Sequence, residues 1–137
     1  MISVRTLVAT LAIASAVGAP ALAAIAPVYR LQARNNAANV VVFSVTKVTL
    51  PFKAGTCLVE GKVWKVERGA RYAVGQPITV QTYCSGRRDE IPDEGVYQDK
   101  PRLKASKWGR AYLGAKDGMA IEYNMLAQPS DPSPKLD

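Results

Sequence analysis

The stretch Cys57-Leu-Val-Glu-Gly-Lys-Val-Trp-Lys-Val-Glu67 alternates between apolar and polar residues, and Pro77-Ile-Thr-Val-Gln-Thr-Tyr-Cys84 repeats this pattern after a short interruption. Alternation with a period of two is typical of β-strands that bury one face. The two stretches therefore predict a β-hairpin. Because Cys57 and Cys84 are the only cysteines and each stretch contains one of them, we expect a disulfide between them.

A symmetric hairpin with Cys57 directly opposite Cys84 assigns every side chain to one of two faces. The first face is mostly apolar and carries the disulfide, with the pairs Val59–Thr82, Gly61–Val80 and Val63–Ile78. The second face carries Leu58, Glu60, Lys62 and Trp64 opposite Tyr83, Gln81, Thr79 and Pro77. We expect the disulfide face to point into the core and the face with Trp64 to point to solvent.

Three further strands are predicted around this hairpin. Residues 40–50 are rich in β-branched side chains, and residues 107–113 and 119–126 flank an Asp117-Gly118 turn signal. Three consecutive strands, a connection of about 22 residues and a final hairpin match the five-stranded Greek-key barrel called the OB-fold. We expect an all-β barrel over residues 40–127, with a β-sandwich as the alternative, and we expect Ile121 and Tyr123 in its core.

The first 23 residues have the features of an export signal. Arg5 supplies a positive charge, residues 7–17 are mostly apolar, and Ala21-Leu22-Ala23 is a small-x-small cleavage site. The apolar run is shorter than the about 20 residues of a membrane span. We therefore expect cleavage between Ala23 and Ala24, a periplasmic or secreted mature chain, and no membrane anchor after cleavage.

The two ends of the mature chain are polar. Residues 24–39 form a lead that is either a helix or a loop, and both alternatives stay open. Residues 128–137 contain three prolines and no apolar pattern, so we expect a disordered tail.

The barrel strands also resemble a known module. Gly61-Lys-Val-Trp-Lys-Val-Glu-Arg-Gly69, Val74-Gly-Gln-Pro-Ile-Thr-Val80 and Cys84-Ser-Gly86 are similar to the netrin-like or tissue-inhibitor-of-metalloproteinase-like OB module. Trp108-Gly-Arg-Ala-Tyr-Leu113 resembles its late strand, so the resemblance covers residues 57–114. Inhibition in that family depends on an N-terminal cysteine. The expected mature terminus here is Ala24, so the resemblance implies the barrel and not the inhibitory mechanism.

The composition leaves little room for catalysis. The chain has no histidine, which removes the commonest general base and transition-metal ligand. Two cysteines alone cannot complete a tetrahedral zinc site. An acidic cluster, Asp89-Glu90 with Asp93-Glu94, leaves a carboxylate-based glycan hydrolase as an alternative, but an exposed loop provides no desolvation to separate the two pKa values. We expect no enzymatic activity, no metal and no cofactor.

Basic and aromatic residues suggest a binding surface instead. If residues 100–104 are extended, Lys100, Arg102 and Lys104 share one face and lead to Trp108. Cationic side chains would bind an anion, and an aromatic face could stack on a sugar ring. The candidate ligand-binding residues are therefore Trp64, Lys62, Tyr83, Arg102, Lys104 and Trp108.

The net charge supports the same interpretation. The chain carries 18 lysines and arginines against 11 acidic residues, a formal charge of +7, which favours anionic partners. An exported location makes nucleic acid a poor candidate. These features predict a non-enzymatic binding module of the bacterial envelope that recognises an anionic polysaccharide or an envelope protein. An inhibitor of a secreted or periplasmic hydrolase is the alternative.

Overall fold

The computed structural model describes residues 21–53, 55–85 and 98–136. The helices are α1 (Ala21–Asn36) and α2 (Lys100–Ala105). The strands are β1 (Asn39–Lys53), β2 (Thr56–Arg68), β3 (Pro77–Ser85), β4 (Gln98–Asp99), β5 (Trp108–Leu113) and β6 (Ala120–Leu126). Most of the expected export signal and the acidic cluster at residues 89–94 lie outside the described residues.

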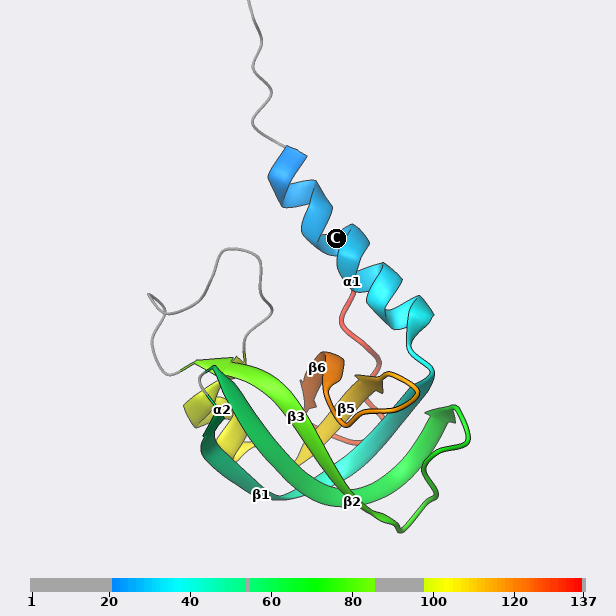
Figure 1. The fold of residues 1–137 in the computed structure, drawn as a ribbon, viewed down its shortest axis with the longest axis vertical. Helices are drawn as coiled ribbons and strands as arrows, with labels where there is room; N and C mark the ends of the chain where they lie inside the picture. Colours follow the sequence, from blue (N-terminus) through cyan, green and yellow to red (C-terminus); the bar gives the residue numbers. More distant parts are fainter. Residues whose placement is uncertain (1–20, 54, 86–97, 137) are drawn as a thin grey trace, which may run out of the picture.

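The strands form one strongly curved sheet in the order β4-β3-β2-β1-β5-β6 (Figure 1). The strands β1, β2 and β3 are a consecutive antiparallel meander, and β1 also pairs with β5 on its other side. The last strand returns toward β3, where the Gln81 amide donates to the Gly118 carbonyl at 2.8 Å. The sheet thus forms a nearly closed barrel with the expected OB-like Greek-key order. The short strand β4 is an additional strand that the sequence pattern did not predict.

The Cys57–Cys84 disulfide is present, with a Cα–Cα distance of 5.9 Å. The predicted register is wrong by two residues, since Cys57 lies opposite Thr82 and Gly61 lies opposite Ile78. The disulfide therefore joins diagonal rather than directly opposed positions. A shift of two residues leaves every side chain on its predicted face, so the disulfide face still points inward.

The register differs because the hairpin closes earlier than the sequence suggested. The Val63 amide donates to the Gln76 carbonyl at 2.9 Å, and the Gly75 amide donates to the Val63 carbonyl at 2.7 Å. Beyond Val63, β2 continues to Arg68 while pairing with β1 alone. Gly75 has a φ of 85° in the following loop, a conformation that glycine adopts without a Cβ penalty.

The barrel interior is apolar and well filled. Its buried members include Val41, Phe43, Val59, Val63, Ile78, Val80, Leu113, Tyr123 and both cysteines. Tyr123 thus lies in the core as expected, and its ring packs edge-on to Phe43 at a centroid distance of 6.0 Å. The core prediction for Ile121 is wrong, because this residue is 50% exposed at the irregularity between β5 and β6.

The helix α2 corrects the expectation that residues 100–104 are extended. Asp99 caps this helix by accepting a hydrogen bond from the Arg102 amide at 3.1 Å, and a proline follows in the first turn. Leu103 is completely buried in the barrel core. Residues two apart on a helix are separated by about 200°, so Arg102 does not share a face with Lys100 and Lys104.

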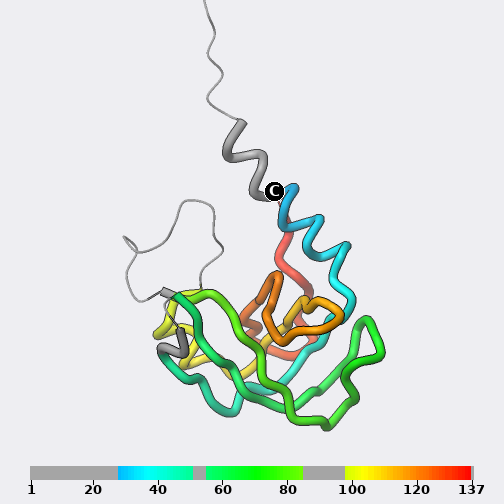
Figure 2. The backbone as a smooth tube through the Cα atoms, in the orientation of Figure 1, coloured from blue at the N-terminus to red at the C-terminus, as the bar shows by residue number. Residues whose placement is uncertain are grey.

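The two ends of the chain form a second layer on the outside of the barrel. The lead at residues 24–39 is mostly helical, as part of α1, and α1 contacts β6. The expectation of a disordered tail differs from the structure, since residues 128–136 make defined hydrogen bonds to β5 and α1, and the end of the segment lies beside α1 (Figure 2). The acceptors in these bonds are main-chain carbonyl groups of the tail. A hydrophobic pattern in the sequence cannot predict contacts of this kind.

Candidate functional site

Two tryptophans meet on the outside of the barrel across its central strand. Trp64 of β2 and Trp108 of β5 lie on opposite sides of β1, and their rings are edge-to-face with a centroid distance of 6.1 Å and an interplanar angle of 71°. Such aromatic pairs contribute about 0.5–1.5 kcal/mol beyond the area that they bury. The pair therefore forms a fixed platform rather than two independent side chains.

Strand pairing places a lysine beside this platform. Ser44 of β1 lies opposite Lys62 on one side and opposite Trp108 on the other, so the three residues form one row across the sheet. Trp64 follows Lys62 by two residues and points to the same side. Trp64 is 45% exposed, and Lys62 is also exposed. We call Lys62, Trp64 and Trp108 the tryptophan surface.

The remaining predicted site residues lie elsewhere. Tyr83 is 47% exposed and lies opposite Thr56, whereas Lys62 lies opposite Pro77. Six residues along β3 correspond to about 20 Å, so Tyr83 is at the other end of the hairpin. Arg102 and Lys104 project from α2 rather than from the strand face. Of the six predicted residues, strand pairing and ring contact therefore unite three.

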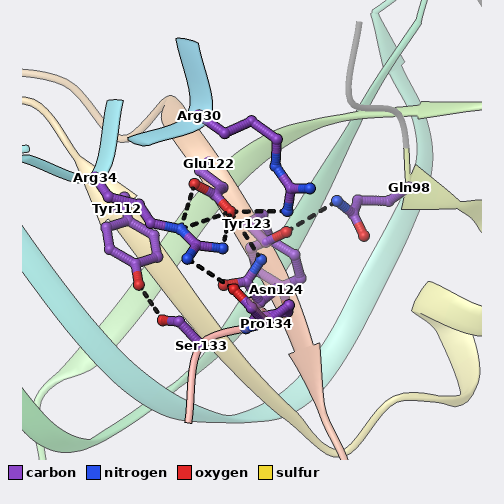
Figure 3. Close-up of polar contacts among 9 residues, drawn as sticks. All are labelled: Arg30, Arg34, Gln98, Tyr112, Glu122, Tyr123, Asn124, Ser133 and Pro134. Atoms are coloured by element: carbon purple, nitrogen blue, oxygen red, sulfur yellow. Dashed lines mark hydrogen bonds and ion pairs between the residues drawn. The ribbon is translucent and has the colours of Figure 1, made fainter. Parts of the chain in front are cut away.

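A buried carboxylate that the sequence analysis did not single out lies on the outer face of β6. The Glu122 side chain is only 2% exposed, and its oxygens accept hydrogen bonds from Arg34 Nη2 at 2.8 Å and Arg34 Nε at 2.9 Å (Figure 3). Arg30 Nη2 and Asn124 Nδ2 donate to Glu122 Oε1 at 3.1 Å and 3.2 Å. The arginines belong to α1, so this cluster attaches the helix to the barrel.

Electrostatics keep Glu122 ionised. Burial alone would raise the pKa of Glu122, but hydrogen bonds from Arg34, Asn124 and Arg30 outweigh burial and hold this pKa below its usual value. The hydrogen bond to Glu122 likewise raises the pKa of Arg34. A carboxylate with a lowered pKa and its oxygens occupied by arginines is a structural anchor and a poor general base.

A second ion pair crosses β1 beside the tryptophans. Arg110 of β5 donates to Glu67 of β2 through Nε at 3.0 Å and Nη2 at 2.9 Å. This fork-shaped pairing is geometrically specific, and only 5% of the Arg110 side chain is exposed. Val42 lies opposite Arg110 on β1 and is completely buried. The charged pair and the tryptophan pair therefore cover successive parts of the same central strand.

Sequence signals for these clusters exist but are weak. Glu122 and Asn124 share a face of β6 by alternation, and Arg30 and Arg34 are four apart on a helix. Their partners are 88 to 92 residues away in the chain. The sequence pattern alone does not show that the two arginines pair with Glu122, because the fold of the barrel brings them together.

Residues 21–53, 55–85 and 98–136 contain no group of three or more metal-ligating side chains, and no helix among them is long and apolar enough to cross a membrane. Burial raises the pKa of the Tyr123 hydroxyl, and within the described part of the chain its oxygen has no hydrogen-bond partner. A hydroxyl enclosed in this way is not accessible to a substrate.

No family model, curated protein or solved structure matches the chain. The resemblance of residues 57–114 to the netrin-like OB module therefore stays a prediction. The candidate site rests on its geometry alone.

Proposed function

We propose that this chain is an exported, non-enzymatic binding module of the bacterial envelope, and that the tryptophan surface recognises an anionic polysaccharide. The observation that carries the proposal is the exposed ring of Trp64, held edge-to-face against Trp108 with Lys62 on the same side. An exposed, fixed aromatic ring offers apolar area to the flat face of a sugar. The lysine ammonium offers a partner for a carboxylate or sulfate group.

The disulfide supports the export part of the proposal. The Cys57–Cys84 bond is buried, with both residues at most 1% exposed. Disulfides persist mainly in oxidising compartments. Cleavage between Ala23 and Ala24 would leave Arg30 and Arg34 on the mature chain. Mass spectrometry of the protein expressed with its leader would therefore test export through the mass of its N-terminal peptide.

Calorimetric titration of the chain with a uronic-acid polymer and with a neutral polymer of equal length tests the binding function. We expect the anionic polymer to bind more tightly, and Trp64→Ala to weaken this binding by about tenfold or more, since burying such a ring is worth roughly 1.5–3 kcal/mol. Lys62→Gln should mainly reduce the dependence of affinity on salt.

A matched control comes from another exposed aromatic residue. Tyr29 on α1 is 65% exposed and lies outside the tryptophan surface, so Tyr29→Ala should leave polymer binding unchanged. Equal binding by wild type and folded Trp64→Ala would exclude the tryptophan surface as the site. Capture of an envelope protein without any polymer binding would favour the protein-partner alternative.

A further inference from the structure

The C-terminal segment, residues 128–136, is held against the outside of the barrel by hydrogen bonds. A turn opens the segment, in which the Gln128 amide donates to Asp131 Oδ2 at 2.9 Å and the Asp131 amide donates to the Gln128 carbonyl at 3.1 Å. Residues 131–134 then follow the outer face of β5. Their sequence is Asp-Pro-Ser-Pro, which favours an extended, polyproline-like backbone.

Three side chains from α1 and β5 hold this segment. Arg110 Nη2 donates to the Asp131 carbonyl at 2.8 Å, and Arg34 Nη1 donates to the Pro134 carbonyl at 2.8 Å. The Tyr112 and Ser133 hydroxyl groups form a hydrogen bond between these two contacts (Figure 3). Two of the three contacts reach main-chain oxygens, so they do not depend on the side chains of the bound segment. We call Arg34, Arg110 and Tyr112 the tail-binding surface.

The tail-binding surface is held in place by groups other than the tail itself. Glu122 binds Arg34 and Glu67 binds Arg110, each through two nitrogens of the guanidinium group. The Arg34 guanidinium also lies over the Tyr112 ring, 5.8 Å from its centroid. Each arginine thus keeps its position and still directs one N–H toward a carbonyl. Such preorganised donors bind an incoming peptide at a lower ordering cost.

We propose that the tail-binding surface is a binding site for an extended, proline-containing peptide of a partner protein, and that residues 131–134 are its resident occupant. A partner segment with a similar spacing of proline and free carbonyl groups displaces the tail. The tail competes at an effective concentration in the millimolar range because it is tethered. Its residues differ from those of the tryptophan surface, and the proposal does not depend on the function proposed for that surface.

The test uses the full-length chain with its tail loosened rather than removed. The variant carries Asp131→Gly, Pro132→Ser, Ser133→Gly and Pro134→Ser, and the probe is a fluorescent synthetic peptide with the sequence of residues 128–136. We expect fluorescence anisotropy to show about tenfold or more tighter peptide binding to this variant than to wild type. Adding Arg110→Gln to the variant should abolish the gain. Pro132 and Pro134 are exposed in the bound tail. Replacing both with glycine in the peptide should still weaken binding, because glycine removes the preference for an extended backbone.

Two results would overturn the proposal. One is equal peptide affinity for wild type and the loosened variant, and the other is no binding to a variant that circular dichroism shows to be folded. A second measurement works on the wild-type chain alone. Excess peptide should shift the amide NMR signals of Ser133 and Lys135, because displacement frees the tail, and unchanged signals under saturating peptide would contradict displacement.

Discussion

Replacing Glu122 by glutamine tests how α1 is held on the barrel. The change removes the negative charge that receives both Arg34 and Arg30, while the shape of the side chain is kept. Removing one partner of a buried ion pair costs about 3–5 kcal/mol, since the other charge stays desolvated. The Arg30 and Arg34 side chains are 31% and 14% exposed, so water partly compensates them. We therefore expect a loss of about 2–3 kcal/mol.

The loss should be local before it is global. The Glu122 cluster joins α1 to β6, whereas the barrel core and disulfide lie on the other side of the sheet. Hydrogen exchange of Glu122→Gln should thus show faster exchange in α1, and urea unfolding should show the change in stability. The control is Glu60→Gln, which removes a partly exposed carboxylate on β2. Unchanged α1 exchange and a stability change below about 0.5 kcal/mol would refute the anchoring role.

The same carboxylate predicts a pH dependence. The pKa of Glu122 is lower in the folded chain than its ordinary value, so its contribution to stability is present above the unfolded pKa of about 4.3. This contribution is lost as the pH falls through the folded pKa. The stability difference between wild type and Glu122→Gln should be constant from about pH 5 to pH 8 and shrink below about pH 4. A difference that grows on acidification would contradict this assignment.

Three further substitutions test the barrel. Serine at both Cys57 and Cys84 should lower the free energy of unfolding by about 3–4 kcal/mol, because the disulfide closes a loop with a sequence separation of 27; a loss below about 1 kcal/mol in urea unfolding would refute this. Gly109→Ala should lower the free energy of unfolding by about 1–3 kcal/mol, since its Cβ would lie 2.2 Å from Tyr123 Oη. Adding Tyr123→Phe should partly restore the melting temperature. Gly61→Ala should destabilise more than Gly109→Ala, because its Cβ would lie 1.9 Å from a main-chain carbonyl of β1, and the reverse order of melting temperatures would contradict the register.

The alternation of Cys57–Glu67 and Pro77–Cys84 was enough to predict the disulfide, the buried face and the exposure of Trp64. These features depend on the period of two, which is local and survives a register shift of two residues. The register itself depended on where β2 stops pairing with β3. This is decided by the competing pairing of β2 with β1, which no local pattern shows.

The contacts on the outside of the barrel could not be predicted from the sequence. The tail contributes main-chain carbonyls rather than apolar side chains, so a method that reads hydrophobic patterns finds nothing at residues 128–136. Likewise, the contact between Trp64 and Trp108 requires β1 to lie between β2 and β5. Such contacts depend on the order of the strands in the sheet. That order depends on how all the elements together bury their apolar faces.

The most direct test of the proposed binding surface uses the two indole N–H signals of the chain, which contains only two tryptophans. In a ¹⁵N-labelled sample titrated with a uronic-acid polymer, we expect both indole signals to shift in a saturable way, with α1 amides unaffected. Saturable shifts elsewhere in the chain, with both indole signals unmoved, would contradict recognition by the tryptophan surface.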